Sequence, residues 1–188
     1  ALEGFHDVPG TGIVVFYPDG GVSPVQRAQM VCQQGANVKV CAVRGNFDDC
    51  QRGVKEAFAA LSKESDSVHL SSANSINIGR LAPQVIYYFT AYTQLLQMGD
   101  IKLGDEVDFV VPTGNFGDIL AGYLAKKLGL PVGTLICASN ANNVLTDFIN
   151  TGCYDRRRPL HKTISPSMDI LVSSNLERLL YLMTEDAQ

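Results

Sequence analysis

One strand-to-helix junction reveals the architecture of this chain, and it reads Val110-Val111-Pro112-Thr113-Gly114-Asn115-Phe116-Gly117-Asp118. Residues 107–111 form an apolar run of strand length, and residues 117–128 have the pattern of an amphipathic helix. Such a turn directs several backbone N–H groups and the positive end of a helix dipole toward one point. Gly114 and Gly117 are expected to let the backbone approach an anion and adopt positive φ. The junction predicts a phosphate-binding turn, with an ordinary helix-capping loop as the alternative.

Strand and helix patterns alternate on both sides of this junction. Strands are predicted at residues 12–18, 38–43, 69–72, 107–111 and 133–138, and residues 168–172 are either a short strand or an extended lead-in. Helices are predicted at residues 24–35, 49–61, 76–96, 117–128, 143–151 and 175–184, with caps at Ser23 and at Asn46 or Asp48. This alternation indicates an α/β fold, with an open, mostly parallel twisted sheet and helices on both faces.

Two segments interrupt the alternation. Residues 152–167 are polar and basic and are predicted to form a long exposed loop, in which Arg156, Arg157 and Arg158 face solvent. Residues 63–67 are a weaker candidate for a boundary between two lobes.

Composition excludes several classes of protein. The 188 residues are 46% hydrophobic with a net charge of −4, so the basic surface of a nucleic-acid-binding protein is absent. No apolar run is long enough for a membrane span. The five cysteines have no metal-ligand spacing, which predicts no metal site; Cys41 and Cys137 are expected in the core. Reduced thiols in an acidic chain favour a cytoplasmic location.

A second polar segment, Ser71-Ser72-Ala73-Asn74-Ser75-Ile76-Asn77-Ile78-Gly79-Arg80, precedes a predicted helix. In a parallel sheet it is expected near the 113–118 turn, because ligands bind at the carboxyl ends of the strands. Arg80 is suited to a carboxylate or phosphate. Helix capping by Asn74, Ser75 or Asn77 is the structural alternative. The chain has neither a P-loop ending nor a dinucleotide GxGxxG fingerprint, which disfavours nucleotide binding.

Several motifs together resemble one family. The 112–118 turn, followed by Ala121-Gly122-Tyr123-Leu124-Ala125, resembles the phosphate-binding loop of the threonine synthase family, whose members are pyridoxal-phosphate enzymes of fold type II. The same family's pattern is matched, in order along the chain, by Phe16-Tyr17-Pro18 with Val22-Ser23-Pro24-Val25-Gln26, by Gly45-Asn46-Phe47-Asp48-Asp49-Cys50-Gln51, and by Ser72-Ala73-Asn74-Ser75-Ile76-Asn77 with Arg80-Leu81.

The resemblance implies a lyase that converts O-phospho-L-homoserine and water into L-threonine and phosphate, with pyridoxal 5′-phosphate as cofactor. It implies that the cofactor phosphate is held by Gly114, Asn115, Phe116, Gly117 and Asp118. Asn77 and Arg80 are expected near the substrate. It also implies that residues 1–66 are part of a smaller α/β lobe and residues 67–188 part of a larger, cofactor-phosphate-binding lobe of an incomplete fold type II core.

One part of the family pattern is missing. The lysine that forms the Schiff base lies in a Phe-Lys-Asp type motif, and no lysine of this chain matches it. The chain also starts without methionine and ends within a helical pattern, which suggests an internal fragment. We therefore expect no catalytic residue here, no activity of the fragment alone, and possible homodimers through surfaces that the fragment exposes. A non-catalytic phosphate or small-anion binding α/β module is the alternative, and a nucleotide-binding transferase is a weaker one.

Overall fold

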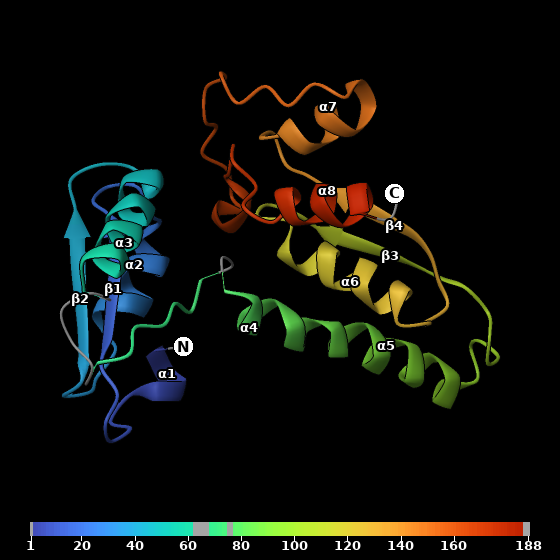
Figure 1. Cartoon of the computed structure of the whole chain (residues 1–188), viewed down its shortest axis with the longest axis horizontal. Helices are drawn as coiled ribbons and strands as arrows, with labels where there is room; N and C mark the ends of the chain where they lie inside the picture. The colour runs from blue at the N-terminus through green and yellow to red at the C-terminus, as the bar shows by residue number, and fades with distance from the viewer. Residues whose placement is uncertain (1, 62–67, 75–76, 186–188) are drawn as a thin grey trace. The chain divides into compact units, whose positions relative to one another are not determined.

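A computed structural model of the chain describes residues 2–61, 68–74 and 77–185 (Figure 1). The chain divides into two compact units, Ala1–Ser71 and Ser72–Gln188. The boundary predicted at residues 63–67 lies outside the described residues, as do Ser75 and Ile76. Within the described ranges, none of the helices has the length and apolar character that crossing a membrane requires.

The first unit is a βαβ arrangement with a helix at each end. Its elements are α1 (Leu2–Phe5), β1 (Ile13–Pro18), α2 (Pro24–Val31), β2 (Val38–Val43) and α3 (Phe47–Leu61). The strands β1 and β2 are parallel, and their register runs from Ile13 opposite Val38 to Pro18 opposite Val43. Parallel neighbours require a crossover connection, which α2 supplies.

Local capping sets the helix starts in this unit. Ser23 and Gln26 form a reciprocal capping box, and Pro24 takes the first helical position of α2, so the predicted cap is confirmed. At the start of α3 the Asn46 side chain accepts from the amide of Asp49 at 3.0 Å, while the Asp49 carboxylate accepts from the amide of Asn46 at 2.8 Å. Asn46, one of the two predicted caps, therefore accepts a hydrogen bond from the first turn of α3.

The expectation that Cys41 is a core residue is wrong. Cys41 is exposed and pairs across the sheet with Phe16, which is 41% exposed. Side chains of a strand alternate between two faces, and Val14 shares the exposed face with Phe16. Among the described residues of the first unit, Tyr17 and Cys50 have buried apolar side chains. An apolar strand sequence predicted burial on both faces, but only one face of this two-stranded sheet is covered.

The second unit contains the second strand pair and most of the described helices. Its elements are α4 (Ile78–Leu81), the 3-10 turn η1 (Ala82–Gln84), α5 (Val85–Met98), β3 (Val107–Pro112), α6 (Gly117–Lys127), β4 (Val132–Ala138), α7 (Val144–Thr151), the 3-10 turn η2 (Pro166–Met168) and α8 (Leu176–Glu185). The strands β3 and β4 are parallel, and α6 connects them. The single helix predicted over residues 76–96 is interrupted at Pro83, which lies in η1.

The core of the second unit lies between α5, α6 and the strands. Figure 1 shows α5 running alongside α6. Tyr88 of α5 packs edge-on against Phe109 of β3, with ring centroids 4.9 Å apart. A Cβ added at Gly122 would lie 2.7 Å from the Tyr88 ring, so only glycine permits this close approach of α5 to α6.

The parallel α/β prediction is confirmed for both strand pairs, with two differences. The described strands form two separate two-stranded sheets, not one open sheet. No strand forms at residues 69–72 or 168–172. In the latter segment, the hydroxyl of Tyr154 donates to the carbonyl of Leu171 at 3.0 Å and accepts from the amide of Ser173 at 2.8 Å. These local partners replace those that a neighbouring strand would supply.

Candidate anion-binding site

A cavity of about 170 Å³ lies where β3 ends and α6 begins. Its wall is formed by Arg80, Gln84, Pro112, Thr113, Gly114, Asn115, Phe116, Gly117, Asp118, Ile119 and Ser167. All of these residues belong to the second unit. The structure therefore brings together the predicted turn and one member of the second polar segment, Arg80.

Thr113 fixes the end of the strand from which the turn departs. Its amide donates to the carbonyl of Ala138 on β4 at 2.8 Å, and its hydroxyl donates to the carbonyl of Val111 at 2.7 Å. The neighbouring Cys137 is half-buried; burial raises the pKa of its thiol, and a hydrogen bond with Thr113 offsets only part of that rise. A protonated thiol is a poor nucleophile, so Cys137 serves the packing of the strand pair.

The positive φ in this turn belongs to Phe116 and not to a glycine. Phe116 has φ of 64° and ψ of 6°, whereas neither Gly114 nor Gly117 has positive φ. Such a conformation is uncommon for a bulky residue and persists only where the surroundings hold it. The Phe116 side chain is 6% exposed and belongs to the core of the unit. The expectation of positive φ at the two glycines is therefore wrong, and core packing holds this conformation at Phe116 instead.

Gly114 has a different role, which is close approach. A Cβ at this position would lie 3.1 Å from the Cδ1 of Ile170 and 3.2 Å from both the Cα of Met168 and the carbonyl oxygen of Ser167. A distant segment of backbone thus crosses directly over the turn. At Gly117 an added Cβ would make ordinary contacts, at 3.4 Å to Asn175 and 3.8 Å to Gln84.

Most backbone donors of the turn have no acceptor within the described part of the chain. The carbonyl of Gly114 accepts from Ser173, and the carbonyl of Asn115 accepts from Asn175. Among the described residues, the amides of residues 114–119 donate no hydrogen bond to protein. The first amide that bonds back into the helix is that of Leu120, to the carbonyl of Phe116 at 3.1 Å. Because residues 114–119 all line the cavity, these amides are available to an anion there.

The carboxylate of Asp118 is held by Tyr88. The Tyr88 hydroxyl donates to the backbone carbonyl of Asp118 at 2.8 Å and to its Oδ1 at 3.2 Å. Burial raises the pKa of Tyr88, and the charge of Asp118 raises it further, so the hydroxyl stays protonated as a donor. The group of Asp118 that suits an anion is therefore its amide.

Arg80 contributes positive charge to the cavity wall. One of its nitrogens, Nη1, donates to the carbonyl of Ala73 at 2.7 Å, which ties the polar segment to the start of α4. Asn77 caps α4: its side chain accepts from the amide of Gly79 at 2.9 Å and donates to the carbonyl of Ser72 at 2.7 Å. The cavity wall includes Arg80 but not Asn77.

Gln84 is a wall residue that the sequence did not single out. Its Oε1 is buried and has no hydrogen-bond partner within the described part of the chain. A buried polar atom without a partner costs about 1–3 kcal/mol. Gln84 lies one residue after Pro83, and no sequence pattern distinguishes it from an ordinary helix residue. An unpartnered amide oxygen in the wall fits a site that is completed by a hydrogen-bond donor of a ligand.

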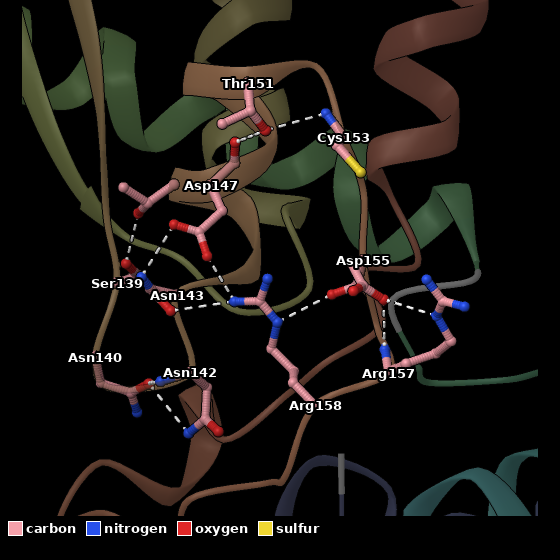
Figure 2. Close-up of polar contacts among 11 residues, drawn as sticks. Ser139, Asn140, Asn142, Asn143, Asp147, Thr151, Cys153, Asp155, Arg157 and Arg158 are labelled. Carbon is pink, nitrogen blue, oxygen red and sulfur yellow. Dashed lines mark hydrogen bonds and ion pairs between the residues drawn. The ribbon is translucent and has the colours of Figure 1, made fainter.

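Arg156, Arg157 and Arg158 of the basic loop do not line this cavity, although Ser167 at the end of that loop does. Arg158 is half-buried and forms an ion pair with Asp147 of α7 at 2.6 Å, while Arg157 pairs with Asp155 at 3.2 Å (Figure 2). Arg158 also donates to the side chain of Asn143 at 3.3 Å. The expectation that all three arginines are solvated is therefore wrong for Arg158, which fastens the loop to the first turn of α7.

Comparisons with known proteins give a consistent result. No protein-family model matches the chain. It is 50% identical over 194 residues to the human protein named Threonine synthase-like 1, and 47% identical over 181 residues to the threonine synthase of Pseudomonas aeruginosa. These alignments cover 97% and 96% of the chain, but 26% and 37% of the relatives.

A solved structure matches over the same region. A PLP-bound threonine synthase from Brucella melitensis superposes with a TM-score of 0.79 at 48% identity, covering 96% of this chain and 38% of that one. The α/β fold of the chain is thus that of a segment of a known enzyme. The chain spans between 26% and 38% of the length of these three proteins.

Proposed function

We propose that this chain, which is similar to threonine synthases over nearly its whole length, forms the cofactor-phosphate seat of a PLP-dependent lyase of that family. The reaction proposed for the whole protein converts O-phospho-L-homoserine and water into L-threonine and phosphate. The enzyme core is proposed to be of fold type II. The observation that carries the proposal is the run of unpaired amides at residues 114–119 around one cavity.

The cavity fits the phosphate of the cofactor. A phosphate ester is a dianion that accepts hydrogen bonds, and the wall offers amide donors at the N-terminus of α6 together with the positive charge of Arg80. Gly114, Asn115, Phe116, Gly117 and Asp118 would hold this group through their backbone. Pyridoxal 5′-phosphate, when bound, supplies an electron sink for the carbon atoms of an amino-acid substrate.

The substrate groups are proposed to lie toward α4. A guanidinium binds carboxylate or phosphate through paired donors, and Arg80 lies in the wall of the cavity. Asn77 holds the segment that leads into α4, so we propose that it acts on the substrate side by shaping this segment.

The 188 residues by themselves are proposed to be inactive. The wall of the cavity contains no lysine, and lysine is the side chain that forms an imine with this cofactor. The described lysines lie elsewhere: Lys39 on β2, Lys55 on α3, Lys102 and Lys162 in loops, and Lys126 and Lys127 at the end of α6. The amine would come from another part of the protein.

Binding is tested on the chain alone by titrating inorganic phosphate and recording amide NMR signals. We expect the amide protons of residues 114–119 to move downfield as phosphate binds to them. The amides of residues 144–147, which begin α7, are the internal control, since an unspecific attraction to helix N-termini would move both sets. Equal movement in both sets, or none in either, would overturn the proposed seat.

Turnover is tested on the whole protein that carries the chain. With added pyridoxal 5′-phosphate, we expect O-phospho-L-homoserine to yield phosphate and L-threonine in equal amounts. Phosphate release without threonine would indicate a different lyase reaction, a relevant outcome because the relatives have two different names. Phosphate binding without turnover in the whole protein would support the non-catalytic module.

Two further expectations remain part of the proposal. A cytoplasmic location is supported by the five cysteines, none of which is in a disulfide. A homodimer through exposed surfaces is supported by exposed apolar side chains on the strands, among them Val14, Phe16, Val110 and Ile136. Light scattering that gives the mass of a monomer at micromolar concentration would exclude the dimer.

A further inference from the structure

We propose that Ser173 and Asn175 are positioning residues that aim the anion-binding amides by holding the carbonyl groups of the turn. This inference deepens the proposed function and rests on it. Neither residue lines the cavity, and both lie far along the chain from the turn, at sequence separations of 59 and 60 residues from Gly114 and Asn115.

The contacts are direct and buried. The hydroxyl of Ser173 donates to the carbonyl of Gly114. Asn175 donates twice to the carbonyl of Asn115, from its backbone amide and from Nδ2, each at 3.1 Å. Ser173 is 6% exposed and Asn175 is fully buried. Water therefore does not substitute for these donors.

Peptide geometry converts these contacts into a direction for the amides. A trans peptide unit is planar, and its C=O and N–H groups point to opposite sides. When Ser173 holds the carbonyl of Gly114, the N–H of Asn115 must point the other way. When Asn175 holds the carbonyl of Asn115, the N–H of Phe116 must likewise point away from Asn175. Both of these amides are unpaired within the described chain and belong to the cavity wall.

Ser173 and Asn175, which together form the clamp on the turn, are themselves held in place. The amide of Ser173 donates to the hydroxyl of Tyr154 at 2.8 Å, and Tyr154 packs edge-on against Phe148 of α7. Asn175 precedes α8, and its carbonyl accepts from the amide of Leu179 at 3.4 Å. Its Oδ1 accepts from Arg178. The orientation of the turn is thus set by α7 and α8 as well as by its own residues.

The conformation of Phe116 explains why a clamp is needed. Positive φ in a residue other than glycine, asparagine or aspartate is strained, so the turn relaxes unless its neighbours prevent it. The buried Phe116 ring holds one side of that residue, and the carbonyl of Asn115 is the point at which Asn175 holds the other.

The test removes one clamp at a time in the full 188-residue chain and titrates inorganic phosphate by amide NMR. In Ser173→Ala we expect the phosphate response of the Asn115 amide to be lost, while the amides of residues 117–119 still respond because the helix presents them. Phosphate affinity should fall about tenfold, the effect of losing one hydrogen bond to a charged group. Ser173→Thr keeps a hydroxyl and should restore both the response of the Asn115 amide and the phosphate affinity.

Two further variants separate positioning from stability. In Asn175→Ala the response of the Phe116 amide should weaken, with a smaller loss of affinity because the backbone donor of residue 175 remains. This variant carries the test if Ser173→Ala does not fold. Ser139→Ala removes a matched hydroxyl bond, to Thr146 at 2.8 Å, outside the cavity wall, and should leave phosphate binding unchanged.

The outcomes distinguish the clamp from the seat. If Ser173→Ala binds phosphate as tightly as the wild type, with an unchanged response at Asn115, the clamp is wrong and the proposed function stands. If all amides of residues 114–119 lose their response together, the two residues have only a general structural role and the clamp is again wrong. If the wild type shows no response at these amides, both proposals fail.

Discussion

Phe116 and Gln84 are two described residues whose local structure carries a free-energy cost. Phe116 adopts a left-handed conformation, and Gln84 buries an oxygen with no partner in the described chain. Both residues line the same cavity. Costs of this kind are typical of functional sites, since a site organised for a ligand is incomplete without it.

Replacing Gln84 tests this interpretation at the scale of one residue. Gln84→Met has a similar volume and no unpaired oxygen, so we expect the free energy of unfolding without ligand to rise by about 1 kcal/mol. Phosphate affinity should fall, because the side-chain amide can no longer turn its NH2 group toward an anion. Urea denaturation with and without phosphate measures both effects.

The control for this prediction is Gln94→Met on the exposed side of α5, which should change neither quantity. A Gln84→Met chain that is less stable than the wild type, and that binds phosphate equally well, would show that Gln84 is an ordinary packing residue.

The segment between α7 and α8, residues 152–175, connects the elements around the turn. Asn140 donates to Asp169 at 2.8 Å, and Asn142 donates to the same carboxylate oxygen at 3.0 Å. Thr163 donates to the Asp169 carboxylate from both its backbone amide and its hydroxyl, each at 2.8 Å. The residues that follow, 167–170, lie against Gly114. The Asp169 carboxylate thus connects the end of β4 to the segment that covers the turn.

Asp169 makes this element sensitive to acid. Burial by itself raises the pKa of this carboxyl, but hydrogen bonds from Thr163, Asn140 and Asn142 outweigh it and hold the pKa below its usual 3.8. The charged form is therefore favoured by folding. The contribution of the charged carboxylate to the free energy of unfolding is fully present above the unfolded-state pKa, near 3.9. It is lost as the pH falls through the lower folded-state pKa.

Asp169→Asn should therefore destabilise the chain by about 1 kcal/mol near neutral pH, a modest value because the carboxylate is partly exposed. The difference from wild type should narrow as the pH falls below about 4. Urea denaturation at several pH values measures it. Asp100→Asn, in the exposed loop after α5, is the control. A difference between wild type and Asp169→Asn that is constant from pH 7 to about pH 3 would contradict the assignment.

At the scale of the whole molecule, the two units have very different cores. The described buried apolar residues of the first unit are Tyr17 and Cys50, whereas one cluster of fourteen forms the core of the second. Apolar burial supplies most of the folding free energy, so stability should be distributed unequally along the chain. The lobe division proposed at residues 66 and 67 would then coincide with a change in local stability.

We expect the first unit to open at a free energy lower than that of the second by at least about 2 kcal/mol, the contribution of one fully buried apolar side chain. Hydrogen exchange of backbone amides in increasing urea measures this difference for β1 and β3 separately. A single transition, with equal opening free energies for both strands, would show that the two units fold as one.

Much of the fold could be predicted from sequence because its determinants are local. The apolar runs predicted β1 to β4, and the 3.6-residue patterns predicted the helices that follow them. Ser23 and Asn46 were recognised as caps because a cap depends on residues three positions away. Turn, strand and helix also coincide at residues 112–118, so the candidate anion seat was visible in the sequence.

What only the tertiary structure decided involves residues far apart in the chain. The sequence predicted positive φ at Gly114 and Gly117, whereas in the structure Phe116 has it and is held by the core. It left residues 168–172 as either a strand or an extended lead-in, and the structure has no strand there, with Tyr154 bonding to Leu171 and Ser173. Ser173 and Asn175 reach the turn across about sixty residues. Periodicity and capping depend on contacts within a few residues of the sequence. The direction of a backbone amide instead depends on the group that binds the carbonyl of the same peptide unit, and that group can lie far away in the sequence.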